Sequence, residues 1–312
     1  MPQPMKKQIP ETMTLDQAKQ LLEQQGIKVV SEEIPIPDKT DIMEEILPEI
    51  DIHNRDLPNG RFYMLDHQMD LPEEWIPSVT TQLGSIHKGH GFNTWNRNLG
   101  HLAPRDRDGK AIKGIHIHYP CLEQMARGME VTDDMIHEMV ASDENKDWKF
   151  HYKNVHLYVN AILRNMWSFQ QFWEDHKPTP IAIEYPLFNE EIRIAGRFDM
   201  LVRMKKTKAA KKESLILIDL KTGGKYWTHA IQNSAYKVAW EQEHPAFPID
   251  YIACLYVRDT FRDKPTYDLH FQKFDYETFK AASKIWHKEH QNVKGVVVPT
   301  IRPRAPRRFK LY

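Results

Sequence analysis

The segment LILIDLKTGG, residues 215 to 224, constrains the fold more than any other stretch of the chain. Its run of aliphatic residues predicts a buried strand. Asp219 and Lys221 lie two residues apart near the end of that strand, so the pleat places both side chains on one face. A buried charge needs a partner, a metal ion or water. Two interpretations follow: an ion pair that closes the strand before a Gly-Gly turn, or part of a reactive site.

Two further carboxylates lie in the strands expected beside this one. Asp199 lies in IAGRFDML, the predicted hairpin neighbour, and Glu184 lies in the otherwise apolar segment IAIEYPLF. Three carboxylates on adjacent strands can bind Mg²⁺ or Mn²⁺, which prefer oxygen ligands. Such a cation activates water and offsets charge on a phosphate, and the lysine would orient or deprotonate that water. The pattern therefore predicts phosphodiester hydrolysis, with Asp219, Lys221, Asp199 and Glu184 as catalytic residues.

The remaining pattern predicts an α/β (α+β) fold, a mixed central sheet flanked by helices with a helical N-terminal part. Alternating or continuous apolar runs indicate five strands, at residues 181–188, 192–204, 214–221, 250–259 and 266–274. Helical periodicity indicates helices at residues 14–26, 154–175, 228–244 and 276–290. We expect three regions: an N-terminal accessory region (1–75), a catalytic core with a helical insertion (76–292) and a basic C-terminal tail (293–312).

Composition excludes several classes of site. Lysine and arginine (43) balance aspartate and glutamate (43), so only local patches can indicate a polyanionic partner. Cys121 and Cys254 are too few for a four-thiolate iron–sulfur cluster or an all-cysteine zinc site, and they are typical of a reducing compartment. No segment is apolar enough for a signal peptide or a membrane span. We therefore expect a cytoplasmic protein with no membrane partner.

Three motifs together resemble the PD-(D/E)xK nuclease superfamily, and specifically its RecB-like branch: GRFD, then LILIDLKTG, then QNSAY. The resemblance implies a restriction-endonuclease-like fold. In that branch the lysine motif is followed by a helix carrying Q-x-x-x-Y, which lies beside the metal centre and contacts DNA. Gln232 and Tyr236 match this motif and lie one helical turn apart. The resemblance implies that both hold the DNA strand, with Tyr236 packing on a sugar or base.

The resemblance extends upstream to the phage exonucleases and the mitochondrial genome maintenance exonuclease group. IPSVTTQL resembles their opening motif, and Gly114 and His118 fit a Gly-x-x-x-His motif whose histidine binds the metal. The resemblance thus adds His118 to Asp199, Asp219 and Glu184 as a metal ligand. Pro120 restricts His118 to a position just before or at the start of a helix, so two alternatives remain: that His116 is the ligand, or that neither histidine is.

Basic residues near these motifs are candidate DNA contacts. Arg197 lies within GRFD, and Lys205 and Lys206 open the basic insertion RMKKTKAAKKES between two predicted strands. This insertion is either a solvated loop or a flap that contacts phosphates, and the tail RPRAPRRFKLY is either disordered or bound to a nucleic-acid backbone.

The functional hypothesis is a metal-dependent DNA exonuclease acting on single-stranded DNA or DNA ends. It would use one or two Mg²⁺ or Mn²⁺ ions, with no iron–sulfur cluster. The setting would be phage-type DNA replication, recombination or degradation in a bacterial or phage-infected cell, with a replication or recombination protein as a further partner. Two alternatives remain: a non-catalytic DNA-binding or recombination module on the same fold, and an endonuclease.

Overall fold

The computed structural model describes residues 52–57, 60–65, 75–86, 89–207, 209–261 and 263–290. The helix predicted at residues 14–26 and the basic tail 293–312 lie outside these residues.

A five-stranded mixed sheet forms the centre of the molecule. Its strands lie in the order β4-β5-β6-β7-β8, and every neighbouring pair is antiparallel except β6 and β7. The strands are β4 (Thr179–Asn189), β5 (Ile194–Met204), β6 (Ser214–Lys221), β7 (Tyr251–Val257) and β8 (Tyr267–Phe271). Because β6 and β7 are parallel, the chain must cross over between them, and it does so through a helix.

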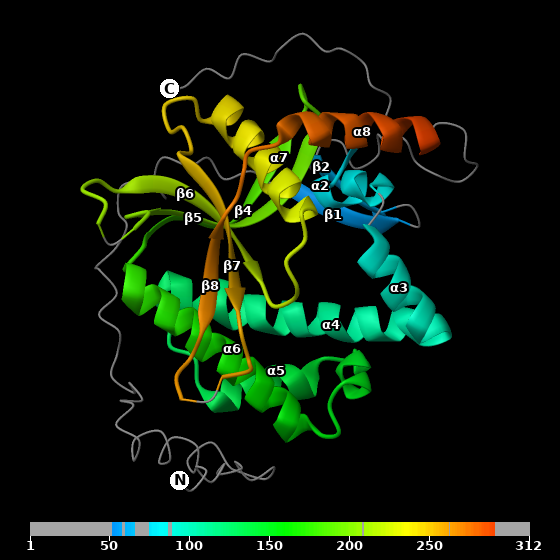
Figure 1. Cartoon of the computed structure of the whole chain (residues 1–312), viewed down its shortest axis with the longest axis vertical. Helices are drawn as coiled ribbons and strands as arrows, with labels where there is room; N and C mark the ends of the chain where they lie inside the picture. The colour runs from blue at the N-terminus through cyan, green and yellow to red at the C-terminus, as the bar shows by residue number, and fades with distance from the viewer. Residues whose placement is uncertain are drawn as a thin grey trace, which may run out of the picture.

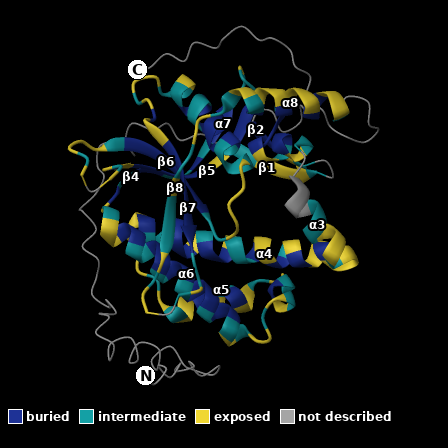
Figure 2. Cartoon of the chain, in the orientation of Figure 1, coloured by how far each residue is buried: buried dark blue, intermediate teal, exposed yellow. Residues whose placement is uncertain are grey.

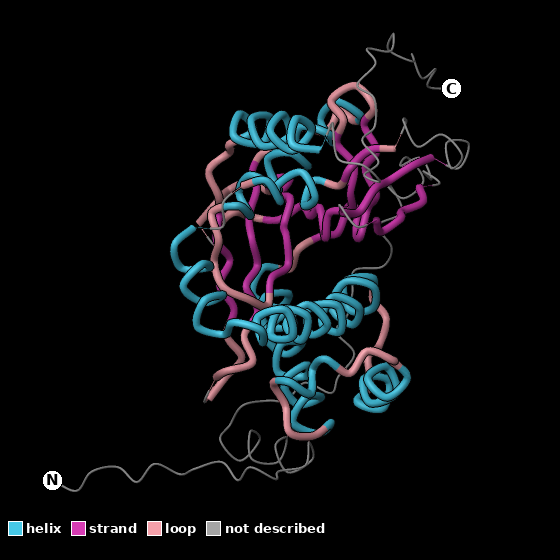
Figure 3. Tube along the Cα trace, turned by 90° about the vertical axis from the view of Figure 1, so that its right-hand side faces the viewer, coloured by secondary structure: helices cyan, strands magenta, loops and turns pink. Residues whose placement is uncertain are grey.

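Helices cover both faces of this sheet (Figures 1 and 3). On one face lie α4 (Ala103–His118), α5 (Asp133–Ser142) and α6 (Val155–His176), and on the other lie α7 (Thr228–Glu243) and α8 (Tyr276–His290). Two large buried clusters correspond to these faces, and the strands are buried from both sides (Figure 2). The mixed, helix-flanked sheet predicted from the sequence is therefore confirmed. None of the helices in the described ranges is long and apolar enough to span a membrane.

A smaller antiparallel sheet precedes this core. It contains β1 (Ile52–Leu57), β2 (Gly60–Leu65) and β3 (Ile76–Pro77), and the helices α2 (Val79–Gln82) and α3 (Gly89–Leu99) follow it. Phe62 of β2 packs against Trp286 of α8, with ring centroids 5.9 Å apart. Tyr63 shares a buried cluster with Ala195 of β5. The described part of the N-terminal region therefore packs directly on the core, and a domain boundary at residue 75 stays a prediction.

Candidate active site

In both β4 and β5 the alternation of side chains between the two faces of the sheet is interrupted, and the interruptions lie opposite each other. In a regular strand, residues two apart share a face. Yet Ile183 packs in the cluster under α4 to α6, whereas Tyr185 packs in the cluster under α7 and α8. Phe198 and Met200 show the same reversal on β5. Irregularities of this kind re-aim side chains beside active sites, and the residues at the two reversals are Glu184 and Asp199.

The backbone at Glu184 accounts for the reversal on β4. Its φ is 50°, in the left-handed region that residues other than glycine rarely adopt. Strain of this kind persists only where the surrounding structure enforces it, and it concentrates at functional sites. Here the pairs Ile183–Met200 and Tyr185–Phe198 hold β4 on either side of the kink. The carboxylate of Glu184 is therefore placed by a strained backbone rather than by the regular pleat.

Asp199 and Asp219 lie opposite each other where β5 and β6 separate. The last backbone pair between these strands is Met200 with Ile218, so the next positions in the register are the two aspartates. The strands remain joined there by a side chain, because the backbone N–H of Leu220 donates to Asp199 Oδ2 at 2.6 Å. This bond fixes the orientation of Asp199, which is 8% exposed.

Asp219 is compensated by its neighbours. Lys221 Nζ lies 2.7 Å from Asp219 Oδ2, as the spacing of two residues on one strand requires. The thiol of Cys254 donates to the same oxygen at 3.4 Å, because the parallel register of β6 and β7 pairs these two residues. The ion pair predicted from the sequence is thus present, and it lies within the group of carboxylates rather than apart from it.

The imidazole of His118 approaches the carboxylates from α4, on the face of the sheet covered by α4 to α6. His118 is the last residue of α4, and a π-helical turn over residues 119–124 follows it. The placement of His118 before or at the start of a helix, inferred from Pro120, is therefore wrong. Proline lacks an N–H and its ring crowds the preceding turn, and the wider π turn accommodates it without ending the helix. Such turns often lie at functional sites.

His116, the rival ligand, is committed elsewhere. Its Nδ1 lies 2.8 Å from the Tyr158 hydroxyl and its Nε2 lies 2.9 Å from Asp143 Oδ2. The side chain is buried among α4 to α6, at 3% exposure. Both ring nitrogens therefore have structural partners, and the interpretation of His118 as the metal ligand is favoured.

His118, Glu184 and Asp199 form a group that could hold a metal ion, with one ligand atom from each lying within 4.8 Å of the others. Asp219, the fourth expected ligand, is not part of this group and pairs with Lys221 instead. His118 Nδ1 lies 3.7 Å from Glu184 Oε1 and 3.8 Å from Asp199 Oδ1. On the other side of the ring, Nε2 lies 3.1 Å from the Leu220 carbonyl. A carbonyl partner requires a proton on Nε2, so in the neutral ring the lone pair of Nδ1 faces the carboxylates. Metal-binding histidines are oriented in this way, so the residues fit a hard divalent cation.

The electrostatics of the group reflect an excess of negative charge. Burial raises the pKa of Asp199 to about 7; the charge on His118 opposes this shift, and that on Asp219 adds to it. Burial disfavours the charged form of His118, yet Asp199 and Glu184 outweigh it, so the pKa of His118 lies above its ordinary value. Burial likewise opposes the charge on Lys221, but Asp219 and Asp199 raise the pKa of its ammonium. Without a cation the site therefore retains protons.

The predicted DNA contacts on β5 and α7 differ in their exposure. Arg197 lies at the edge of the site, half exposed, with its Nη1 3.8 Å from Glu184 Oε2. Tyr236, however, is 3% exposed, and its hydroxyl packs so closely under Gly196 that a Cβ there would lie 2.7 Å from it. The stacking role expected for Tyr236 does not fit this burial. Burial raises the pKa of the Tyr236 hydroxyl well above its ordinary value, and Gln232, one turn away on α7, opposes this shift only weakly.

The basic loop between β5 and β6 lies at the wrong end of β6 for a flap over Asp219. It precedes Ser214, five residues before Asp219, which is about 17 Å of strand. Lys206 instead packs on Tyr251, with Nζ 3.8 Å from the ring centroid. Lys205 adjoins it at the end of β5. The expectation that these lysines act beside the catalytic strand is therefore not supported by their position.

Exposed apolar side chains flank the site and were not predicted. Ile115 and Tyr119 are one turn apart at the end of α4, 62% and 46% exposed. Tyr226 and Trp227 follow the Gly-Gly turn after Lys221, 56% and 54% exposed. The segments that carry them come close at one point, where a Cβ on Gly114 would lie 4.0 Å from Thr222 Oγ1. The signal for Tyr226 and Trp227 was in the sequence, where two aromatic residues close a glycine-containing segment directly behind DLK.

Three carboxylates, a lysine and an imidazole at the middle of a mixed sheet form a donor set typical of enzymes that hydrolyse phosphate esters with a divalent cation. The sequence also matches the family model of the PD-(D/E)XK nuclease superfamily over residues 105–302, more than half of the chain. The chain therefore belongs to the PD-(D/E)XK nuclease superfamily. The match includes every residue of the site described above. No protein of curated function matches the sequence.

Proposed function

We propose that the protein is a divalent-metal-dependent deoxyribonuclease that acts as an exonuclease on single-stranded DNA or DNA ends. The observation that carries this proposal is the juxtaposition of the group His118, Glu184 and Asp199 with the ion pair of Lys221 and Asp219. Family membership supports phosphodiester hydrolysis, and the resemblance of Gln232 and Tyr236 to the Q-x-x-x-Y motif favours exonuclease action.

Each residue has a role that follows from its surroundings. His118, Glu184 and Asp199 would hold Mg²⁺ or Mn²⁺, with Asp219 at their side. A cation bound there would act as a Lewis acid toward the scissile phosphate and activate water. The ammonium of Lys221, held by Asp219 at 2.7 Å, would orient the attacking water and stabilise charge on the phosphate. Arg197 lies at the edge of this group and would contact the neighbouring phosphate of the strand.

The exposed side chains beside the site support unpaired DNA as the substrate. Aromatic rings that are half exposed to solvent are the groups on which single-stranded bases stack, irrespective of sequence. Tyr119 directly follows the ligand His118, and Tyr226 and Trp227 follow the segment that contains Lys221. A base-paired duplex would keep its bases from these rings, whereas a single strand or a frayed end would not.

The test is cleavage of end-labelled DNA with Mg²⁺ or Mn²⁺ and with EDTA. We expect single-stranded linear DNA to be degraded only with the metal, and closed circular DNA to resist. Asp219→Asn and Lys221→Met should each slow degradation by about 10²–10³-fold or more, and replacing Lys153, an exposed lysine just before α6, with alanine should not. Blocking one terminus or the other would report the direction of digestion.

Three outcomes would contradict parts of the proposal. Cleavage that persists unchanged in Asp219→Asn and Lys221→Met would remove the catalytic assignment. Cutting of closed circles would indicate an endonuclease. Retention of DNA without cleavage by any metal would indicate a binding or recombination module.

A further inference from the structure

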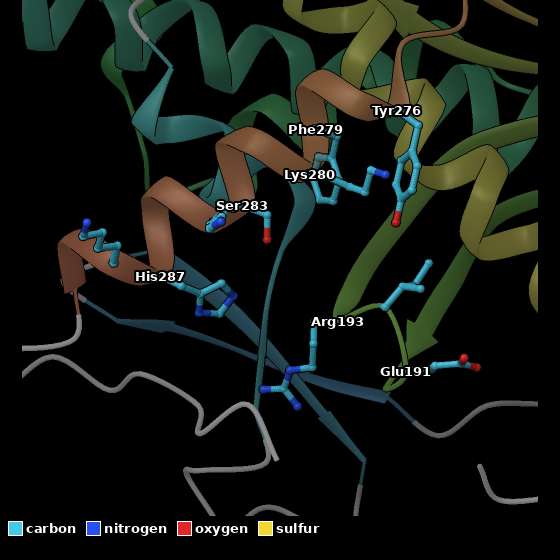
Figure 4. A pocket seen from close by; sticks show the side chains of 10 residues that line it. Glu191, Arg193, Tyr276, Phe279, Lys280, Ser283 and His287 are labelled. Carbon is cyan, nitrogen blue, oxygen red and sulfur yellow. The ribbon is translucent and has the colours of Figure 1, made fainter. Parts of the chain in front are cut away.

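A pocket of about 440 Å³ lies away from the carboxylates (Figure 4). One wall is the turn between β4 and β5, at residues 191–193, and the other is one face of α8. Glu184 and Asn189 are five residues apart on β4, about 17 Å of strand, and the turn lies beyond Asn189. The pocket is therefore separate from the metal-binding group.

The rim of the pocket is basic. Lys280, Lys284 and Lys288 recur every four residues on α8, so they form one exposed ridge along its rim. Lys280 pairs with Glu277 at 2.6 Å, whereas no ion pair with a described residue involves Lys284 or Lys288. Arg193 adds a fourth cation from the opposite wall, and Glu191 is the one carboxylate among the described lining residues.

Two side chains in this pocket have hydrogen-bonding atoms that are buried and unpartnered. His287 is 5% exposed, and neither of its ring nitrogens has a partner among the described residues. The guanidinium of Arg193 donates from Nη2 to the Trp75 carbonyl at 3.1 Å, but its buried Nε has no acceptor there. Figure 4 shows His287 extending from α8 and Arg193 from the turn on the other side of the pocket. Buried polar groups without partners are costly and rare, so each of these side chains lacks an acceptor for an N–H group.

The backbone holds Arg193 in place at some cost. Its φ is 55°, in the left-handed region. The buried amide of Gln82 donates to the Arg193 carbonyl at 3.0 Å and to the Pro77 carbonyl at 2.8 Å, which ties the turn to α2 and β3. Hairpin turns often contain one left-handed residue, and these two bonds hold Arg193 in that conformation.

We propose that this pocket binds a phosphate group. Phosphate oxygens would accept hydrogen bonds from the guanidinium of Arg193 and from the imidazole N–H of His287, and the lysines at the rim would offset the charge. A guanidinium and several ammonium groups around a cavity favour a phosphate over a neutral ligand. The same chemistry has two sources: a phosphate of a DNA strand, which rests on the proposed function, or a free phosphate or mononucleotide, which does not.

Isothermal titration in EDTA tests this proposal without any cleavage. The probes are inorganic phosphate, a deoxynucleoside 5′-monophosphate and a short oligothymidylate, each with the wild-type chain and with Asp219→Asn. We expect at least one probe to bind both chains alike. Arg193→Gln and the double variant Lys284→Ala/Lys288→Ala should weaken that binding roughly ten- to hundredfold, as expected for lost charge-assisted contacts. Lys153→Ala, also an exposed lysine, should bind as the wild type does.

The outcomes distinguish a free phosphate ligand from a phosphate of a DNA strand, and they distinguish failure of this proposal from failure of the nuclease proposal. Binding of inorganic phosphate or the mononucleotide that these variants weaken identifies a free ligand, and weakening for the oligothymidylate alone identifies a strand phosphate. The binding measurements are repeated in the Asp219→Asn background, so they remain interpretable even if the protein is not a nuclease. The double lysine variant changes only exposed side chains, so it remains informative if Arg193→Gln fails to fold. No binding by any probe, or equal binding by all variants, would overturn the proposal and indicate a pocket filled by water.

Discussion

The two halves of the candidate active site differ in how their negative charge is compensated. Asp219 has a lysine at 2.7 Å and a thiol donor at 3.4 Å on the same oxygen. Glu184 and Asp199 have no cation within hydrogen-bonding distance: the nitrogens of His118 and Arg197 lie 3.7 to 3.8 Å from their oxygens, and the close donor to Asp199 is the uncharged N–H of Leu220. The first half is a closed ion pair, and the second retains an excess of negative charge. Cation binding is thus expected in the half that Lys221 does not neutralise.

We call Asp219 and Lys221 the closed half of the site, and His118, Glu184 and Asp199 the open half. The largest effect is expected when the ion pair of the closed half is broken. Lys221→Met leaves Asp219, which is 3% exposed, as an unpaired buried carboxylate. We expect the free energy of unfolding to fall by about 3–5 kcal/mol, and cleavage in a single turnover to fall by about 10²–10³-fold. Urea unfolding and rapid-quench cleavage measure the two effects.

The double variant Asp219→Asn/Lys221→Met is the matched control for this pair. It removes both charges, so most of the lost stability should return, whereas the lost cleavage should not. A single Lys221→Met variant as stable as the wild type would show that solvent, rather than Lys221, compensates Asp219.

The open half is tested by comparing two histidines of α4. His118→Asn removes the nitrogen that faces the carboxylates, so the Mn²⁺ concentration for half-maximal cleavage should rise by about 10–100-fold. His116→Asn should leave this concentration unchanged but destabilise the fold by about 1–3 kcal/mol, since its partners Tyr158 and Asp143 lose a buried bond. If the two variants exchanged these effects, His116 would be the ligand.

The excess charge of the open half predicts how stability depends on pH. Burial raises the pKa of Asp199 from its ordinary value of 3.8 to about 7, so the folded protein holds a proton that the unfolded chain releases. The contribution to stability is therefore greatest below pH 4 and is lost as pH rises to about 7. The raised pKa of His118 acts in the same direction.

We expect the protein in EDTA to unfold at lower urea concentrations at pH 8 than at pH 6. Asp199→Asn should reduce this difference and keep the bond to Leu220, because an amide oxygen still accepts from that N–H. A saturating divalent cation should also reduce it. Equal stability at both pH values in EDTA would show that the open half carries no excess charge.

The sequence predicted the closed half of the site better than the open half. Apolar periodicity and the spacing of Asp219 and Lys221 are local signals, and the pleat alone brings these two side chains together. The sheet, its order of helices and strands, and the positions of Glu184 and Asp199 on neighbouring strands were also predictable from local patterns.

The parts that could not be predicted depend on long-range packing. The kink at Glu184 has no local signal, since glutamate has no preference for left-handed backbone. Pro120 normally limits a helix, and only the π turn lets α4 continue past His118. The face of α7 that carries Tyr236 is buried because it packs under Gly196, which helix periodicity cannot indicate.

The smallest expected effect concerns the strain in the open half. Glu184→Gly and Glu184→Ala both remove the carboxylate, but only glycine adopts a φ of 50° without steric cost. Left-handed backbone costs a side chain about 1–2 kcal/mol, and glycine loses about 0.5–1 kcal/mol through chain entropy. The glycine variant should therefore be more stable than the alanine variant by up to about 1.5 kcal/mol. Arg203, exposed on β5, supplies the control, because at a regular strand position alanine should be the more stable of the two. The same order at both positions would mean that Glu184 is not strained, and that only charge distinguishes the open half from the closed one.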